Sequence, residues 1–376
     1  MNLAIFSMHQ IPYQTPLFNE IAKINKNTFV YYLDALGSQD YYNPYFKNNI
    51  EVEEDLYKNY NYLFIKNYSK KNITGFFSRI NFDIFKIFLK KEIDVVVVNG
   101  YQTLSSWILF CLSFIFYKKI FIFKGETTRI KRSNFKRFII NLFMSRFTFY
   151  IYSCHGNYLF FKSFGIDNKS LINIPCSVNY DYFTKYYRDN IENIDKFKKK
   201  YEITNNHKTI VFVSKLINRK NPLELLKAVK AIKDIKIKIL FVGDGPLKKD
   251  IIKYSKLYKI KSSFTGFLKQ SELGSAYMVA DLYVNTSIYD ASPKTINECL
   301  CFNIPMIVSD VAGQSSDIVE DNLNGFIYKE GDVDDLSMKI KLALKLDKQK
   351  ISKKNKFLID QTHPRVGAKN LIDKIS

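Results

Sequence analysis

The stretch "DLYVNTSIYDASPKTINECLCFNIPMIVSD", residues 281–310, decides the fold of the second half of the chain. It contains an apolar run typical of a strand, a polar loop, a short segment with helical spacing and a second apolar run. Two strands joined through a helix pair in parallel, because the helix crosses over the sheet between them. The stretch therefore predicts one strand-helix-strand unit of a parallel sheet.

The helix of this unit has start and stop signals. Ser292 is a good N-cap, and Pro293 suits the first helical position because its missing N–H would have no helical partner there. Asn303 tolerates the left-handed cap conformation and Pro305 cannot extend a helix, so we expect the helix to end near Phe302.

Two carboxylates lie on either side of the helix start. Helical periodicity turns Glu298 roughly 200° away from Ile296, so Glu298 is expected to point out of the core. The N–H groups of Lys294 and Thr295 favour an anion by about 0.3–1 kcal/mol. This arrangement predicts a diphosphate site in which Glu298 binds a ribose and Asp290 a sugar. The alternative is an ordinary strand, loop and helix with two surface acids.

Further cations follow the first strand of the same half, "TIVFVSKL". Lys215, Arg219 and Lys220 can add charge-assisted hydrogen bonds of roughly 1.5–3 kcal/mol each to a bound phosphate. Gly243 and Gly266 end two other strands. Ligands of open α/β sheets bind at the carboxyl ends of the strands, so all of these groups are expected near one site.

The same alternation of strands and helices runs through both halves, which predicts an α/β protein with two doubly wound parallel-sheet domains. The expected division is a first domain at 1–180, a polar linker at 181–208, a second domain at 209–355 and a C-terminal helix at 356–376. That last helix, interrupted near Pro364, is a candidate to pack back on the first domain.

Charge indicates an anionic partner without choosing one. The net charge is +21, which suits nucleic acid, an anionic membrane face or phosphorylated small molecules. Residues 131–150 mix Lys and Arg with Phe, Ile, Leu and Met, as a helix on an anionic membrane does, or as an ordinary covering helix does. The apolar run at 104–123 is short for a bilayer span, and a buried helix followed by a strand explains it better.

Cysteines and the start of the chain indicate a cytoplasmic protein. The five cysteines show neither metal-site spacing nor the density of a secreted disulfide scaffold, so free thiols in a reducing compartment are expected. The start, "MNLAIFSMHQ", enters a strand directly and lacks the basic region and cleavage site of a signal peptide.

From about 210 to 330 the chain resembles the nucleotide-sugar domain of family 4 glycosyltransferases, whose architecture of two Rossmann-like domains facing across a cleft is called GT-B. The similar segments stand in the order and spacing of the family, and "PYQTPLFNEIA", "KGETTRIKR" and "SLINIPCSVNYDYF" resemble N-terminal segments of some members. The five segments of the second half that match the family in order and spacing are "FVSKLINRKNPLELLKA", "FVGDGPLK", "FTGFLKQSEL", "ADLYVNTSIYDASPKTINECLCFNIPMIVSD" and "DNLNGFIYKEGD".

The resemblance implies roles for individual residues. Lys215 and Lys220 stand where the family has a diphosphate-binding Arg and Lys, and Asp290 and Glu298 stand at the two ends of its E-x7-E motif. In the family the first acid contacts the donor sugar and the second the ribose. The chain departs from the pattern in three ways: Asp290 is one methylene shorter than Glu, Lys215 is a point charge instead of a forked guanidinium, and Asn303 replaces a Gly.

A fourth departure is the sequence "SMHQIPYQ", which replaces the Gly-rich turn that many members have after the first strand. Two residues of the first half are candidates for the acceptor side: Glu126, at the end of a strand in "KGET", and His9, in the loop after the first strand. Their alternatives are a structural cap for Glu126 and a plain loop histidine for His9.

The implied activity is retaining transfer of a hexose-like sugar from a UDP- or GDP-sugar to a sugar or lipid-linked hydroxyl, without a dedicated metal or other cofactor. Assembly of cell-surface polysaccharide, lipopolysaccharide or glycolipid at the inner membrane face is the expected setting. The expected catalytic residues are Asp290, Lys215, Lys220 and Glu126. The expected donor-binding residues are Glu298, Arg219, Ser292, Pro293, Lys294, Thr295, Gly243, Gly266 and Phe267.

Two other function classes stay open. A nucleic-acid or anionic-surface binding protein would use the positive charge itself, with residues 131–150 as its best face, although no nucleic-acid partner is expected from the resemblance. A nucleotide-sugar epimerase of the same architecture is the nearer rival. The "DVD" at 332–334 is better explained as a helix N-cap than as a metal site.

Overall fold

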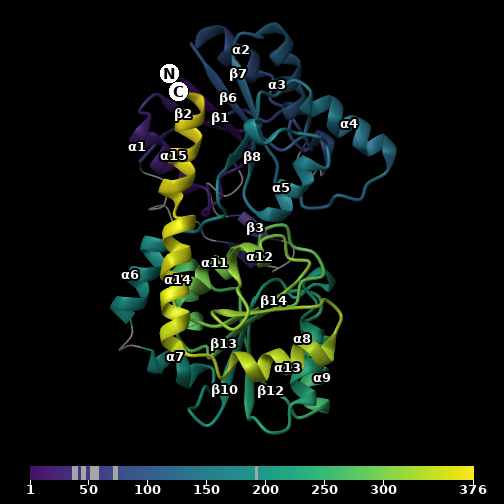
Figure 1. Cartoon of the computed structure of the whole chain (residues 1–376), viewed down its shortest axis with the longest axis vertical. Coiled ribbons are helices and arrows are strands. Elements are labelled where there is room, and N and C mark those ends of the chain that lie inside the picture. The colour runs from purple at the N-terminus through teal and green to yellow at the C-terminus, as the bar shows by residue number, and fades with distance from the viewer. Residues whose placement is uncertain (36–40, 44–47, 51–58, 71–74, 191–193) are drawn as a thin grey trace. The chain divides into compact units, whose positions relative to one another are not determined.

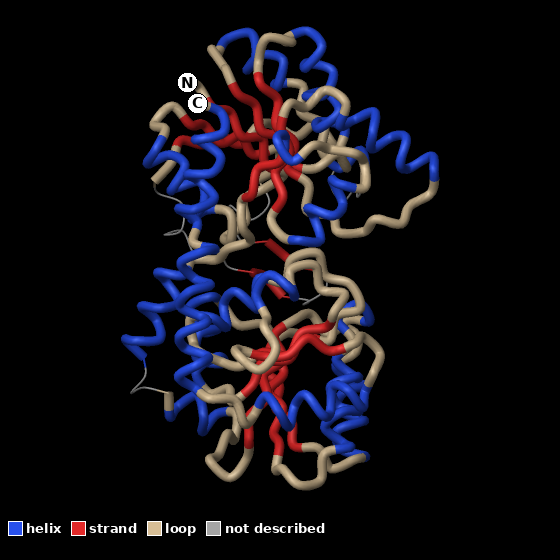
Figure 2. The backbone as a smooth tube through the Cα atoms, in the orientation of Figure 1, coloured by secondary structure: helices blue, strands red, loops and turns tan. Residues whose placement is uncertain are grey.

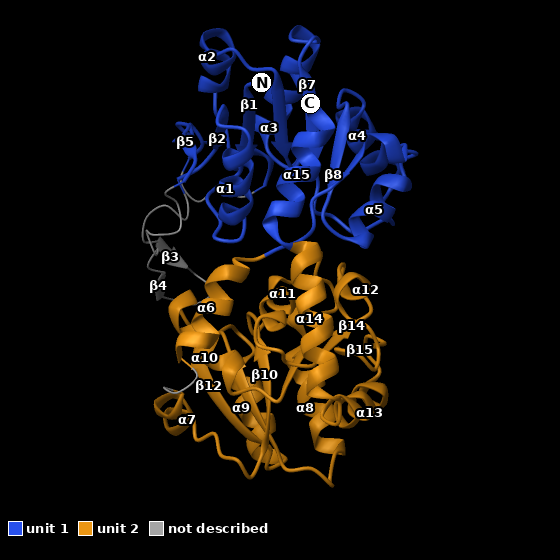
Figure 3. Cartoon of the chain, turned by 60° about the vertical axis from the view of Figure 1, so that its left-hand side comes forward, with its two compact units in different colours: residues 1–42, 49–177, 363–376 blue, residues 43–48, 178–362 orange. Residues whose placement is uncertain are grey.

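The computed structural model describes residues 1–35, 41–43, 48–50, 59–70, 75–190 and 194–376. The chain divides into two compact units (Figure 3). The first unit contains residues 1–42, 49–177 and 363–376, and the second contains 43–48 and 178–362. Each unit is built on its own parallel sheet with helices on both faces (Figure 2), so the prediction of two doubly wound α/β domains is confirmed.

In the described residues of the first unit, seven parallel strands form one sheet in the order β5-β2-β1-β6-β7-β8-β9. The order reverses direction between β1 and β6, which are neighbours with Leu3 opposite Val95. The strands are β1 (Leu3–Ser7), β2 (Thr28–Tyr32), β5 (Asn61–Phe64), β6 (Val95–Asn99), β7 (Ile120–Lys124), β8 (Phe149–Tyr152) and β9 (Leu171–Asn173).

Alternate residues of these strands belong to two apolar cores, one on each face of the sheet. Phe6, Val98 and Phe123 face a core closed by four helices, and Ile5 and Val97 face one closed by two others. The helices that close the core with Phe6 are α2 (Asp83–Lys90), α3 (Leu104–Ile115), α4 (Asn134–Met144) and α5 (His155–Lys162). The helices that close the core with Ile5 are α1 (Thr15–Ile24) and α15 (Pro364–Ile375).

The apolar run at 104–123 forms α3 and then β7, as predicted (Figure 1). Leu109 and Leu112 of α3 are buried in the first unit's core, which explains the apolar character of the run. No helix in the described part of the chain combines the length and the apolar character needed to cross a bilayer.

In the described residues of the second unit, six parallel strands have the order β12-β11-β10-β13-β14-β15, with the reversal between β10 and β13. The strands are β10 (Lys208–Val213), β11 (Ile237–Val242), β12 (Lys261–Gly266), β13 (Leu282–Asn285), β14 (Met306–Ser309) and β15 (Gly325–Tyr328). A short pair, β3 (Tyr41–Asn43) and β4 (Asn48–Ile50), stands apart from both sheets.

The first helix of the second unit begins at Tyr180, the last residue of the expected first domain, and continues into the expected linker, of which residues 191–193 lie outside the described part. The described helices of this unit are α6 (Tyr180–Asn190), α7 (Asp195–Lys200), α8 (Pro222–Ala231), α9 (Lys248–Leu257), α10 (Gln270–Met278), α11 (Lys294–Leu300), α12 (Ser315–Ile318), α13 (Val333–Ala343) and α14 (Lys348–Thr362). Asp332 caps α13, its side chain accepting from the Asp335 N–H at 2.9 Å, as the N-cap interpretation of "DVD" predicts.

The C-terminal helix returns to the first unit. His363 caps α15 by accepting from the Arg365 N–H at 3.3 Å, and Pro364 occupies the first turn. α15 packs on α1 and β9 (Figure 3), and Asn370 donates to the Asn173 carbonyl at 2.9 Å. A Cβ at Gly367 would lie 2.7 Å from a methyl carbon of Ile174, so glycine permits this close contact.

Candidate functional site

The candidate site of the second unit lies where the strand order reverses, at the carboxyl ends of β10 and β13. These strands are neighbours, with Ile210 opposite Leu282. The reversal leaves the loops after the two strands free to diverge, and it is the usual ligand position in such sheets. Lys215 follows β10, and Asp290 follows β13.

Thr286 joins the two loops. Its side chain is buried, and its hydroxyl donates to the carbonyls of Lys220 at 3.0 Å and Asn221 at 2.8 Å. The Ile288 N–H adds a bond to the Arg219 carbonyl at 3.0 Å. The turn that carries the cations is therefore fixed against the loop that carries Asp290.

This arrangement pairs Lys220 with Asp290. Nζ of Lys220 donates to Oδ2 of Asp290, and the two side chains are 13% and 15% exposed. Asp290 also accepts from the Ser292 N–H at 3.3 Å, and its carbonyl accepts from the Gly313 N–H at 2.8 Å. The carboxylate thus lies within the cation cluster and offsets part of its charge.

Lys215 is the second cation of this cluster. Burial lowers its pKa, and the positive charges of Arg219 and Lys220 lower the pKa further. Arg219 donates to the Tyr289 carbonyl at 3.4 Å. Lys215, Arg219 and Lys220 lie close enough to repel one another, and an anion such as a diphosphate would offset that repulsion.

The two glycines allow loops to approach closely. Gly243 has a φ of 129°, and a Cβ there would lie 2.1 Å from the Ser214 carbonyl oxygen. Its N–H donates to the carbonyl of Gly266, which has a φ of 73°, at 2.8 Å. Phe267, the next residue, is 43% exposed. The turns after β10, β11 and β12 therefore pack together beside the cation cluster.

The start of α11 differs by one residue from the expected start. The N-cap is Pro293 in an extended conformation, and the helix begins at Lys294, so Ser292 as N-cap and Pro293 as first helical residue were wrong. The reason is that Ser292 belongs to a turn closed by Asp290, and its hydroxyl accepts from Lys294 Nζ at 3.1 Å. Thr295 pairs with the Tyr283 hydroxyl at 2.5 Å.

The end of α11 is close to the expected one. Cys301 is the C-cap, and Asn303 has a φ of 52°, the left-handed conformation predicted for it. A difference of one or two residues at a helix end is within the usual variation of helix boundaries.

Glu298 does not point outward, and this expectation was wrong. Its side chain is buried, as are all neighbours from Ile296 to Leu300. Periodicity predicts an exposed face only for a helix with one covered side, whereas α11 also packs on α14 and its Asn297 donates to the Tyr180 hydroxyl of α6 at 2.8 Å.

The partner of Glu298 is Tyr277 of α10, whose hydroxyl donates to Oε2 of the carboxyl. Burial raises the pKa of Glu298 to about 7, against the opposing effect of this hydrogen bond. Glu298 is thus an internal carboxyl that titrates near neutral pH. Tyr277 was not among the expected site residues, because nothing in the pattern of α10 relates it to α11.

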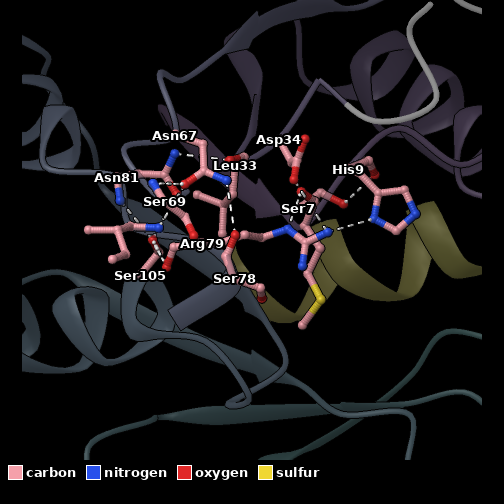
Figure 4. Close-up of polar contacts among 12 residues, drawn as sticks. Ser7, His9, Leu33, Asp34, Asn67, Ser69, Ser78, Arg79, Asn81 and Ser105 are labelled. Atoms are coloured by element: carbon pink, nitrogen blue, oxygen red, sulfur yellow. Dashed lines mark hydrogen bonds and ion pairs between the residues drawn. The ribbon is translucent and has the colours of Figure 1, made fainter. Parts of the chain in front are cut away.

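In the first unit, His9 lies in a polar network at the carboxyl ends of β1 and β2 (Figure 4). Arg79 donates to the Met8 carbonyl at 3.2 Å and to Nδ1 of His9 at 3.5 Å, and lies 3.8 Å from Asp34. Burial, and then the Arg79 charge, lower the pKa of His9 to about 4, while Asp34 opposes them. His9 is therefore neutral at pH 7, with Nδ1 as an acceptor.

Asn81 holds the loop that carries Arg79 (Figure 4). Its buried amide donates to the carbonyls of Leu33 and Lys66, each at 2.9 Å, and accepts from the Ser105 hydroxyl at 2.7 Å. Neither Arg79 nor Asn81 was expected from the sequence. The local sequence around the two residues does not show which strands they join.

Glu126 follows β7, at the carboxyl edge of the first sheet. Its carboxylate lies 3.5 Å from Nζ of Lys124, whose side chain is 9% exposed against 49% for Glu126. The acid thus compensates a buried cation and remains accessible to solvent. Among the described residues, no three His, Cys, Asp or Glu side chains gather in a way that could hold a metal ion.

Comparison with known proteins relates part of this chain to a family. Residues 193–358 match the family model of glycosyl transferases group 1. Sulfoquinovosyl transferase SQD2 of Arabidopsis thaliana is 34% identical over 125 residues, which are 32% of this chain and 24% of that protein. Alpha-monoglucosyldiacylglycerol synthase of Acholeplasma laidlawii is 28% identical over 165 residues, 42% of this chain and 40% of the relative. The matches thus span less than half of these relatives.

Solved structures resemble the whole chain. A glycosyltransferase from Rickettsia africae has a TM-score of 0.75 and 16% identity, covering 100% of this chain and 97% of its own. Anabaena HepE in complex with UDP and glucose has a TM-score of 0.72 and 14% identity, covering 99% and 98%. At these identities the likeness shows the fold alone, and it confirms the predicted GT-B fold.

Proposed function

Because residues 193–358 match the model of glycosyl transferases group 1 and the chain has the GT-B fold, we propose that it is a retaining enzyme that transfers a sugar from a nucleoside-diphosphate donor to an acceptor hydroxyl. The observation that carries the proposal is the cluster of Lys215, Arg219 and Lys220, with Asp290 paired to Lys220, at the strand-order reversal of the second unit. The cluster lies within the part of the chain that matches the family model.

In this proposal the cations bind the donor's diphosphate. As the bond to the sugar breaks, negative charge develops on the leaving diphosphate, and Lys215 and Lys220 are already in place to stabilise it. Asp290 accepts hydrogen bonds from the donor sugar, and its pairing with Lys220 sets its orientation. Glu298 accepts hydrogen bonds from the ribose. No metal or other cofactor is part of the proposed mechanism.

A uridine nucleotide is the first donor to test, because Anabaena HepE was solved with UDP and with UDP-glucose. Named relatives make glycolipids or transfer galactose to a diphosphoundecaprenol-linked sugar. These names support a sugar or lipid-linked acceptor in polysaccharide or glycolipid assembly. His9 and Glu126, at the carboxyl edge of the first sheet, are the proposed acceptor-side residues.

The first unit has a surface suited to the anionic inner face of the cytoplasmic membrane, where a lipid-linked acceptor would lie. On α4, Phe135, Phe138 and Leu142 are 73%, 63% and 41% exposed and follow one helical stripe. Between Asp94 and Asp167 the sequence has ten Lys and Arg residues and a single acid, Glu126. Exposed aromatic rings beside excess positive charge favour binding at an anionic bilayer surface.

Binding and product analysis test the proposal. Isothermal titration calorimetry with UDP and GDP is expected to show one nucleotide that binds, with affinity reduced at least tenfold in Lys215→Ala. Lys253→Ala, which removes an exposed lysine of α9, is the matched control and should bind normally. Nuclear magnetic resonance of the product should then show a retained anomeric configuration.

Two outcomes would contradict the proposal. Equal loss of affinity in the Lys253→Ala control would mean that positive charge in general, and not the cluster, attracts the nucleotide. Binding of neither nucleotide, together with oligonucleotide binding that falls steeply as salt rises, would favour a nucleic-acid-binding protein instead.

A further inference from the structure

Tyr277 contacts the carboxyl of Glu298 from a different helix of the second unit. It lies on α10, 21 positions before Glu298, and its hydroxyl donates to Oε2 of that carboxyl. Its ring is buried and stacks on Phe302, with ring centroids 5.3 Å apart and an interplanar angle of 29°. The stacking limits ring movement, so the position of the hydroxyl is set by packing.

Of the described ionisable groups packed around it, Glu298 is the one whose pKa lies near 7. Burial raises the pKa of Tyr277 and of Cys299 well above their usual values, and the pKa of Cys301 to about 12. The pKa of Tyr283 on β13 is also raised by burial. Asp181 of α6 acts on Cys301, and the buried residues of α14, which packs on α11, are uncharged.

The hydrogen bond from Tyr277 opposes the effect of burial on Glu298. A buried carboxyl favours its neutral form, because the charged form loses its hydration. A hydroxyl donor favours the charged form, since an ionised carboxylate accepts a hydrogen bond more strongly than a neutral acid does. Within the described residues, this bond is the interaction that lowers the pKa of Glu298.

We propose that Tyr277 is a positioning residue, which holds Glu298 by one oxygen in the ionised state and orients the other oxygen to accept hydrogen bonds from the donor's ribose. The proposal rests on the proposed function and adds a residue and a pH dependence to it. Nucleotide affinity should fall as pH falls through the pKa of Glu298, because a protonated carboxyl accepts fewer hydrogen bonds.

Replacing Tyr277 by Phe keeps the stacking ring and removes the donor. The pKa of Glu298, about 7 in the native chain, should then rise. A rise of about one unit would lower the ionised fraction at pH 7 from about a half to about a tenth, so affinity there should fall about fivefold. Near pH 9 both proteins would be almost fully ionised, and the difference should disappear.

Calorimetric titration with UDP, and with GDP in parallel, between about pH 6 and pH 9 tests this inference on the full chain. The variants are Tyr277→Phe and Glu298→Gln. Tyr328→Phe is the matched control, because Tyr328 is also buried and donates to a buried carboxyl, Oε2 of Glu224, at 3.1 Å. Tyr277→Phe should move the pH midpoint of binding upward, Glu298→Gln should remove it, and Tyr328→Phe should leave it in place.

A second measurement follows the carboxyl without nucleotide. Infrared difference spectra between the native chain and Glu298→Gln should show that Glu298 becomes protonated near pH 7. The same comparison between Tyr277→Phe and the double variant Tyr277→Phe, Glu298→Gln should show this protonation at a higher pH. An unchanged midpoint in the Tyr277→Phe background, or a loss of affinity that is equal at every pH, would overturn the inference. If the native chain binds no nucleotide while the carboxyl titration shifts as expected, the proposed function fails and the Tyr277–Glu298 coupling stands.

Discussion

The Lys220–Asp290 pair leads to the sharpest prediction, through the substitution Asp290→Asn. The two side chains are only 13% and 15% exposed, so removal of the carboxylate charge leaves Lys220 poorly solvated beside Lys215 and Arg219. A hydrogen bond to a charged group contributes roughly 1.5–3 kcal/mol, and loss of one partner leaves the other buried and unpaired. We expect the nucleotide-free protein to lose about 1–3 kcal/mol of stability.

The same substitution should strengthen nucleotide binding. A diphosphate entering the cluster would meet one more unneutralised cation, so part of the lost stability is recovered on binding. Recovery of about 1.4 kcal/mol corresponds to a tenfold tighter dissociation constant. Sugar transfer should nevertheless fall strongly, because in the proposed function Asp290 binds the donor sugar. Tighter nucleotide binding with slower transfer is the expected combination.

Thermal unfolding followed by circular dichroism, with and without the nucleotide, measures both effects. Asp234→Asn serves as the control, because Asp234 forms an ion pair with Lys341 at 2.7 Å whose side chains are 61% and 39% exposed. Such an exposed pair should change stability little. The reasoning is refuted if Asp290→Asn binds the nucleotide more weakly than the native chain, or is destabilised equally with and without it.

Three further predictions concern backbone contacts and the surface of α4. Gly243→Ala, whose Cβ would lie 2.1 Å from a carbonyl oxygen, should cost about 1–3 kcal/mol and weaken nucleotide binding, measured by thermal shift and calorimetry. Gly367→Leu should loosen α15 from the first unit and increase hydrogen exchange in α15 and α1, with unchanged exchange in the second unit. The double variant Phe135→Ser and Phe138→Ser should sediment several-fold less with anionic vesicles, whereas Leu257→Ser, exposed on α9, should sediment normally.

The parallel strands and their carboxyl ends could be predicted because their signals are local. Apolar runs such as "TIVFV" and "KILFV" are buried on both faces of the sheet, so they appear as continuous apolar stretches between polar ones. The residues that follow such runs must lie at the carboxyl edge of the sheet. This reasoning brought Lys215, Lys220 and Asp290 to one site before their contacts were known.

The environment of α11 could not be predicted in the same way. Helical periodicity assigns one face to the core, but it carries no information about helices that approach from other directions. α14 and the Tyr277 ring are brought to α11 by segments of chain that lie far from it in the sequence. Glu298 was therefore expected outside the core and lies inside it, where its carboxyl acquires a pKa of about 7.

By itself, the sequence determined the class of fold, the positions of the strands' carboxyl ends along the chain and the presence of cations and carboxylates there, because each depends on neighbouring residues in the chain. Only the tertiary structure decided which of these groups touch and how far each is from water. Three contacts join segments that are separated in the sequence: the ion pair of Lys220 with Asp290, the hydrogen bond of Tyr277 to Glu298 and that of Arg79 to His9. Hydration and neighbouring charge set the chemistry of an ionisable group, and both follow from packing in three dimensions.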